Sequence, residues 1–298
     1  MKSEKFTVVH DAPMQVGESP VWHPVESALY WVDIDGRAVH RLHPASGKHS
    51  AWTMATEPSA IAVDQDNNLV VATRAGFVYL NTSSGDVEDL VAAPYDTAIM
   101  RFNDGRVDPR GRFWVGTIYE PRDAQKAEMY VLDKGALRQA WSGGMTNSNG
   151  LAWSPDGTTM YHADTTSHRV DAYDYDADSG TPSNQRNLVA FQDDKKAQDY
   201  GGRPDGAAID SEGNYWVAMF EGARIVKLSP TSELLAEIQL PVRCPTSVCF
   251  GGPDLRTLYV TSASQGRSAQ ELEQYPHSGK VLAFHVDVPG IEQVEYQG

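Results

Sequence analysis

Cysteine, basic residues and long apolar runs are all scarce in this sequence of 298 residues. The two cysteines, Cys244 and Cys249, are too few for a disulfide framework and have no second pair to complete a zinc knuckle, so we expect buried free thiols. Lys and Arg total 25 against 40 acidic residues. The resulting net charge of -15 disfavours nucleic acid and anionic membrane as partners.

Targeting and linker signals are also missing. No run reaches transmembrane length, and residues 1–5 lack the apolar core of a signal peptide, so a cytoplasmic location is expected. No linker rich in Ser, Gly or Pro divides the chain, which predicts a single domain over residues 1–298 with no obligatory protein partner. The polar stretches Asp176 to Asn187 and Gln192 to Arg203 are interpreted as loops within it. Helix signals are sparse, and Ser268 to Gln274 is expected to form a helical turn.

What the sequence does contain is a turn followed by a short apolar strand, repeated six times. Strand formers such as Phe113, Trp114 and Val115 follow a polar turn in each unit. The units are 41 to 56 residues apart and begin at Trp22, Val63, Val107, Trp153, Ile209 and Phe250. Such a period is typical of β-propellers, whose four-stranded blades bury their faces against neighbours. We therefore predict an all-β, six-bladed β-propeller with four-stranded antiparallel blades, and a large β-sandwich is the alternative.

The two ends of the chain both have strand composition. Phe6 to His10 and Val281 to Val286 are rich in β-branched and aromatic residues. We expect these segments to share the last blade and close the ring.

Polar residues precede several of the repeated strands at matching positions. Asn103-Asp104-Gly105, Asn149-Gly150 and Asp205-Gly206 lie before three of the units, and Glu18 lies before the first strand. In a propeller, equivalent positions of successive blades converge on one end of the central channel, so these side chains are expected to meet there. Taken singly, each Asn-Gly or Asp-Gly is also explained by a plain turn, and spacing alone leaves both readings open.

The sequence resembles the sugar-lactone hydrolase family that includes the gluconolactonases and senescence marker protein 30, also called regucalcin. The motifs that match are Gly17 to Trp22, Trp31 to Ile34, Arg101 to Gly105, Val107 to Pro109, Ser148 to Leu151, Val170 to Tyr175, Pro204 to Gly206, Cys249 to Gly252 and Leu258 to Thr261. They span nearly the whole chain in the order found in the family. The resemblance implies a six-bladed propeller with one divalent metal ion in its channel, bound by Glu18, Asn149 and Asp205.

The same resemblance implies how the substrate is held. Arg101 and Asn103 match positions that bind the sugar, and Glu120 is what remains of an acidic pair that contacts substrate in the family. Family metals include calcium, zinc, manganese, magnesium and iron. An oxygen-rich ligand set without Cys or His suits Ca²⁺, Mg²⁺ or Mn²⁺ and accepts Zn²⁺ or Fe²⁺. Three protein ligands leave positions open for water and a substrate oxygen, which favours catalysis.

Lactone hydrolysis needs a polarised carbonyl, an attacking water and a proton donor for the departing ring oxygen. Asp205 is the candidate that takes the proton of the water and returns it to the leaving oxygen. His23, His162 and His168 lie outside any Gly-x-Ser-x-Gly motif and are interpreted as ordinary strand-end or surface residues.

The predicted function is metal-dependent hydrolysis of a sugar-acid lactone, such as a glucono-, xylono-, arabinono- or galactonolactone, to the free acid. Arginines such as Arg101, Arg122 and Arg203 would also suit a second carboxylate, so a lactone derived from an aldaric acid or uronate is an alternative. Two rivals are another ester or phosphotriester hydrolase on the same scaffold and a non-enzymatic propeller that binds metal or protein.

Overall fold

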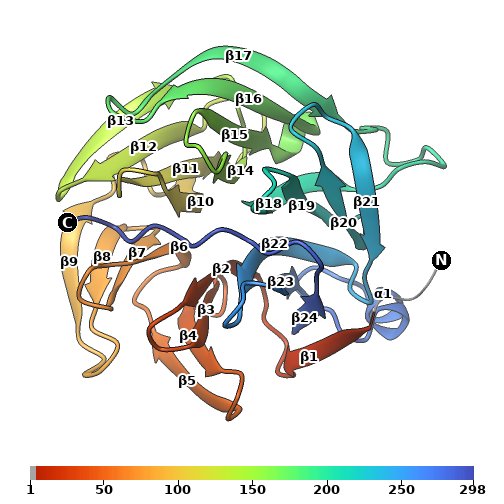
Figure 1. Cartoon of the computed structure of the whole chain (residues 1–298), viewed down its shortest axis with the longest axis horizontal. Coiled ribbons are helices and arrows are strands. Elements are labelled where there is room, and N and C mark those ends of the chain that lie inside the picture. Colours follow the sequence, from red (N-terminus) through yellow and green to blue (C-terminus); the bar gives the residue numbers. More distant parts are fainter. Residues whose placement is uncertain (1–4) are drawn as a thin grey trace.

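The computed structural model describes residues 5–298, and its strands form six four-stranded antiparallel sheets arranged radially around a central channel (Figure 1). The first three blades consist of β2 (Gly17–His23), β3 (Ala28–Asp33), β4 (Ala38–His43) and β5 (Lys48–Thr53); β6 (Pro58–Val63), β7 (Leu69–Thr73), β8 (Gly76–Leu80) and β9 (Val87–Ala92); and β10 (Met100–Val107), β11 (Phe113–Tyr119), β12 (Glu128–Asp133) and β13 (Ala136–Ser142). This arrangement confirms the predicted propeller.

The remaining blades complete the ring. They consist of β14 (Ser148–Trp153), β15 (Thr159–Asp164), β16 (Arg169–Asp176) and β17 (Thr181–Ala190); β18 (Arg203–Ile209), β19 (Tyr215–Phe220), β20 (Arg224–Leu228) and β21 (Leu234–Gln239); and β22 (Cys244–Gly251), β23 (Thr257–Ala263), β24 (Val281–His285) and β1 (Phe6–His10). In the last blade β1 pairs with β24, with Phe6 opposite Phe284 and Val8 opposite Leu282. The prediction that both ends of the chain share one blade is confirmed.

The hydrophobic core is divided among the six interfaces between neighbouring blades. Tyr30 of the first blade and Val71 of the second belong to one buried cluster, and Trp31 and Tyr259 belong to the cluster between the first and last blades. Each blade therefore buries both faces, which explains why the sequences of its inner strands are continuous apolar runs. The two cysteines are buried and free, as expected.

The repeated turn has a physical cause. The Asp108 carboxylate accepts hydrogen bonds from the amides of Arg110 and Arg112 at 2.8 and 3.1 Å and from the Trp114 indole at 3.0 Å. Asp210 repeats the pattern two blades later, with the Trp216 indole at 2.9 Å. One aspartate thus holds the turn and anchors the tryptophan of the next strand, which accounts for the spacing of these residue types in the sequence.

The Asn-Gly and Asp-Gly pairs are not turns. They lie inside β10, β14 and β18, the innermost strands of three blades, where the pairing register shifts between Phe102 and Gly105, Asn149 and Ala152, and Pro204 and Ala207. A similar shift follows Glu18 in β2. Each shift is a β-bulge, which redirects side chains and is common beside active sites. The plain-turn interpretation is therefore wrong.

One of the two predicted loops is also wrong. Asp176 ends β16, and β17 begins at Thr181, so most of the stretch from Asp176 to Asn187 belongs to a hairpin. β17 is the outermost strand of its blade and largely exposed, which explains its polar composition. The second stretch is a loop from Gln192 to Gly202. The predicted helical turn is confirmed as α1 (Ala269–Gln274). A short 3-10 turn, η1 (Thr165–Ser167), occurs in the fourth blade.

The prediction about a signal peptide concerned residues 1–5. Residues 1–4 lie outside the described part of the chain. Neither helical segment of the described chain has the length and apolar character that a bilayer crossing requires.

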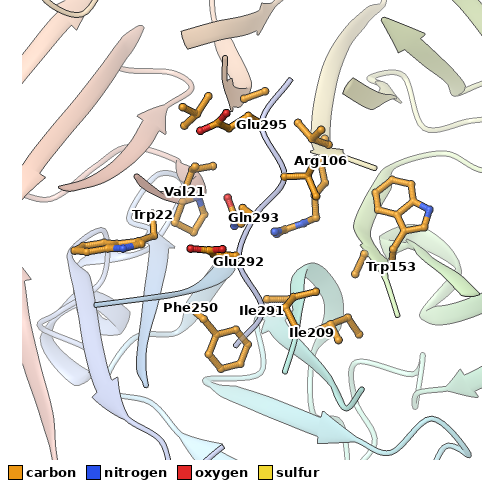
Figure 2. A pocket seen from close by; sticks show the side chains of 18 of the residues that line it. Val21, Trp22, Arg106, Trp153, Ile209, Phe250, Ile291, Glu292, Gln293 and Glu295 are labelled. Atoms are coloured by element: carbon orange, nitrogen blue, oxygen red, sulfur yellow. The ribbon is translucent and has the colours of Figure 1, made fainter. Parts of the chain in front are cut away.

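After β24 the chain crosses one end of the channel, visible as the dark blue segment in Figure 1. We call residues 286–298 the C-terminal strap. Its backbone bonds to four blades: Gly290 N donates to Leu255 O at 2.8 Å, Pro289 O accepts from Ser211 N at 2.8 Å, Tyr296 N donates to Val63 O at 2.7 Å, and Gln297 N donates to Gly111 O at 2.9 Å. A cavity of about 220 Å³ lies between the strap and the inner strands (Figure 2). The opposite end of the channel carries the predicted site residues.

Candidate active site

Four inner strands supply the predicted site, each near the residue where it begins. Glu18 is the second residue of β2, Asn149 the second of β14, Asp205 the third of β18 and Asn103 the fourth of β10. All four are 7% exposed or less. Because the inner strands neighbour one another around the channel, the bulges place these side chains at one end of it.

Two of these groups are carboxylates buried close to each other. Burial, followed by the charges of Asp205 and Asp104, raises the pKa of Glu18 well above its usual range. Burial and the charge of Asp104 likewise raise the pKa of Asp205, against the opposing effect of Arg203 and Arg101. The site therefore concentrates negative charge that protein groups do not fully balance.

A chain of hydrogen bonds fixes the amide of Asn149. Its Nδ2 donates to Thr165 Oγ1 at 2.7 Å, and that hydroxyl donates to the carbonyl of Pro204 at 2.8 Å. On the other side Asn149 Oδ1 accepts from Asn103 Nδ2 at 3.1 Å. The amide orientation is thus set by Thr165 and Asn103, and Oδ1 keeps a second lone pair for a further partner.

The guanidinium of Arg101 is positioned from both sides. Its Nη1 donates to Asn103 Oδ1 at 2.7 Å, while its Nε lies 3.8 Å from Glu120 Oε1. Both oxygens of Glu120 accept from Arg74, at 2.8 and 2.9 Å, and Arg74 also pairs with Glu57 at 3.1 Å. The bond from Arg74 lowers the pKa of Glu120, which stays ionised beside Arg101.

The structure brings together the three residues predicted to bind metal. Glu18 and Asp205 interact electrostatically, and Asn149 is tied through Thr165 to the residue before Asp205. Two carboxylates and one oriented amide oxygen are hard donors, and a divalent cation between them would offset the repulsion that raises both pKa values. The donor set fits such an ion, and the ligand roles of these residues stay a prediction.

Sequence reasoning missed three residues that support this site. Thr165 orients Asn149, while Arg74 and Glu57 hold Glu120 beside Arg101. Thr165 follows a strand of its own blade and Arg74 comes from another blade, so no local motif links them to the residues they position. The bond from Thr165 depends on the pairing of β14 with β15, and the role of Arg74 and Glu57 depends on the contact between the second and third blades.

The three histidines interpreted as strand-end or surface residues are all buried, so the surface reading is wrong. His23 is fully buried at the end of β2, and His168 is 6% exposed. His162 lies within β15, 3.0 Å from Ser148 Oγ, and burial lowers its pKa to about 4. Ser148 is itself fully buried, so this pair is not open to a substrate.

A propeller whose channel carries an oxygen-donor site is the class defined by these observations. The family described as SMP-30/Gluconolactonase/LRE-like region matches residues 16–264. A 6-deoxy-6-sulfogluconolactonase from Pseudomonas putida is 43% identical, over 99% of this chain and 100% of that protein. Regucalcin from Xenopus laevis is 36% identical over the full length of both proteins.

The solved structures give the same result. The calcium-binding protein regucalcin from Agrobacterium tumefaciens superposes with a TM-score of 0.92 at 27% identity, over 99% of this chain and 98% of that chain. The chain belongs to the SMP-30/gluconolactonase family, and the family predicted from its motifs is confirmed.

Proposed function

We propose that this protein hydrolyses a sugar-acid lactone to the free acid at the channel site. The observation that carries the proposal is the set of buried Glu18, Asn149 and Asp205 oxygens beside the donors of Arg101 and Asn103. The similarity to a sulfogluconolactonase along the whole chain supports it. One divalent ion, Ca²⁺, Zn²⁺, Mn²⁺, Mg²⁺ or Fe²⁺, would be held by Glu18, Asn149 and Asp205.

Glu18, Asn149 and Asp205 would hold a divalent cation, which would supply polarisation of the lactone carbonyl and a lower pKa for a neighbouring water. The protein's own groups do the rest. Asp205 takes a proton from the attacking water as the new C–O bond forms, and returns it to the ring oxygen as the acyl C–O bond breaks. Arg101 and Asn103 hold the sugar hydroxyls, and Glu120 holds the Arg101 side chain in place and is proposed to contact the substrate at the rim.

The test is a panel of lactones with metal-stripped protein and single ions added back. We expect hydrolysis of sugar lactones to be lost on chelation and restored by an ion, and to exceed hydrolysis of phosphotriesters. Faster turnover of organophosphates would favour the other hydrolase, and activity indifferent to chelators would exclude the metal-dependent reaction. The cytoplasmic location and the lack of an obligatory protein partner stay predictions.

We further propose that the substrate carries an anionic group away from the lactone, such as a sulfonate or a second carboxylate. Arg203 lies close enough to Asp205 to affect its pKa, and its side chain is 15% exposed. A planar guanidinium suits a sulfonate or carboxylate. Pairing with Glu221 at 3.2 Å and contact with the Phe220 ring at 5.2 Å hold it in place.

We expect Arg203→Gln to lower kcat/KM for a sulfonated or carboxylated lactone by roughly 10- to 100-fold, because it removes a hydrogen bond between charged groups. The value for a neutral lactone should fall less, because only the effect of the Arg203 charge on the pKa of Asp205 is then lost. Arg186→Gln, at an exposed position on the outermost strand β17, is the matched control and should leave both values unchanged. Equal losses for anionic and neutral lactones would contradict this assignment of Arg203.

A further inference from the structure

Three imidazoles meet at the seam where the first blade contacts the last. His10 lies on β1 of the closing blade, and His40 and His49 lie on β4 and β5 of the first blade. One ring nitrogen from each lies within 4.8 Å of the other two, and His40 Nδ1 is 3.0 Å from His49 Nε2. The cluster is far from the channel along the blade, because β5 is the outermost strand of its sheet (Figure 1).

Local structure holds the cluster in place. His40 lies opposite Trp31 in the sheet and stacks on its indole, with ring centres 5.1 Å apart and an angle of 8°. A bulge between Val8 and His10 lets the consecutive residues Val9 and His10 both face the cluster around Trp31. His40 is thus rigid, His10 is half-buried, and His49 is exposed and free to adjust.

We propose that His10, His40 and His49 form a second metal site, for a borderline first-row cation such as Zn²⁺. Imidazole nitrogen is a preferred ligand of Zn²⁺, whereas Ca²⁺ and Mg²⁺ prefer oxygen. Zn–N bonds of about 2.0–2.1 Å place tetrahedral nitrogens about 3.3 Å apart, so zinc binding would draw the three rings together from the observed separations of up to 4.8 Å. Water completes the coordination.

The protonation state of the cluster suits this role. Burial, followed by the charge of His49, lowers the pKa of His10 to about 4, and burial lowers that of His40 to about 3. These imidazoles are therefore neutral at pH 7, the form that binds metal. The carboxylate of Asp11, next in the chain, is engaged by Lys280 at 2.7 Å.

A metal at this position connects β1 to β4 and β5, and so fastens the closing blade to the first. Ion binding to the folded state alone raises thermal stability by mass action. The site is independent of the lactonase proposal, because none of its ligands belongs to the channel.

The experiment uses untagged, metal-stripped full-length protein, so that no polyhistidine tag contributes. Zn²⁺ is titrated by calorimetry in excess Ca²⁺, and bound zinc is counted after dialysis. We expect His49→Asn and His10→Asn to bind one equivalent of zinc fewer than wild type. His285→Asn, an exposed histidine of β24, is the matched control and should bind as much zinc as wild type.

Thermal melting gives a second readout. Zinc at a hundredfold excess over its Kd should raise the wild-type Tm by roughly 5 °C, and most of that shift should be absent in His49→Asn. Lactone hydrolysis by His49→Asn should equal that of wild type. A Glu18→Gln/Asp205→Asn double variant should keep the zinc that His49→Asn loses.

Equal zinc binding by wild type, His49→Asn and His10→Asn would overturn the proposal, as would loss of all zinc in the channel double variant. Anomalous diffraction at the zinc edge from wild-type crystals decides the matter without any variant. A peak among the three imidazoles is expected, and its absence from zinc-soaked crystals would overturn the site.

Discussion

The two ends of the channel shift the pKa of a buried carboxylate in opposite directions, and β18 has one such carboxylate at each of its ends. Asp205, near its start, has a raised pKa because burial and Asp104 disfavour its charge. Asp210 follows its end and is fully buried. Burial alone would raise the pKa of Asp210 too, yet hydrogen bonds from Trp216, Asn214 and Lys227 outweigh burial and lower it.

This difference distinguishes carboxylates that stabilise the fold from carboxylates of the candidate active site. At the strap end the Asp210 carboxylate is surrounded by donors, so its ionisation stabilises the fold, and Lys227 Nζ lies 2.9 Å from Asp210 Oδ2. Arg106 there donates to the carbonyls of Leu151 and Ala207 at 2.9 and 2.6 Å, and Figure 2 shows its guanidinium pointing into the cavity beside Gln293. At the open end burial and neighbouring carboxylates raise the pKa values of Glu18 and Asp205, and such perturbed groups are typical of a functional site.

The largest effect is expected from Asp205→Asn. Removing a proton acceptor that also ligates the ion should lower kcat for the lactone by about 10³-fold or more. The melting temperature of the metal-free protein should not fall, because the amide removes a buried charge. Steady-state kinetics with calorimetric melting checks both. Near-normal activity would show that another group accepts the proton.

Asp210→Ala should have the opposite profile. It leaves Lys227 and the Trp216 indole without their acceptor, which costs about 3–5 kcal/mol for a broken buried pair. Urea unfolding should detect the loss, while kcat of the folded fraction stays near that of wild type. A kcat loss comparable to that of Asp205→Asn would show that the two ends are not separate.

The contrast also explains what could be predicted from the sequence. The repeat was visible because Asp108 and Asp210 recur with the tryptophans they anchor, so the turn carries its own local signature. The ligand residues were found from a family resemblance, since Asn149-Gly150 by itself looks like a turn. What the sequence hides is the bulge within β14, which depends on pairing with β15.

Contacts between blades were hidden for the same reason. Thr165 and Arg74 act on residues of other strands, and the three seam histidines come from segments whose neighbours are known only once the ring closes. The polar β17 was missed because an exposed outer strand has no apolar face to reveal it. The periodic pattern of apolar residues reflects burial, so it does not reveal a strand that is exposed to water.

The contribution of the strap can be tested with Tyr296→Ala. Tyr296 is 4% exposed, packs in the cluster between the second and third blades, and its hydroxyl accepts from Gly135 N at 2.9 Å. Loss of the ring should lower the free energy of unfolding by about 3 kcal/mol, with kcat unchanged. Val294→Ala, at a strap position that is 39% exposed, should stay within about 0.5 kcal/mol of wild type. Equal effects of the two variants would mean that the strap is not anchored by its aromatic residue.

The smallest expected effect sharpens the comparison through pH. In the metal-free protein the folded-state pKa of Glu18 is raised above its ordinary 4.5, so ionisation destabilises the fold as pH rises above that value. Glu18→Gln should therefore be more stable than wild type by about 1–2 kcal/mol at pH 8, and this difference in stability should shrink as pH falls towards 4.5.

Asp210 has a lowered pKa, so the stability that its charge provides is present above pH 3.8. The loss of stability in Asp210→Asn should therefore stay constant between pH 8 and 5. Adding the metal should reverse the order of wild type and Glu18→Gln, because only wild type then gains binding energy. A pH-independent gap for Glu18→Gln would show that this carboxylate is balanced by the protein itself.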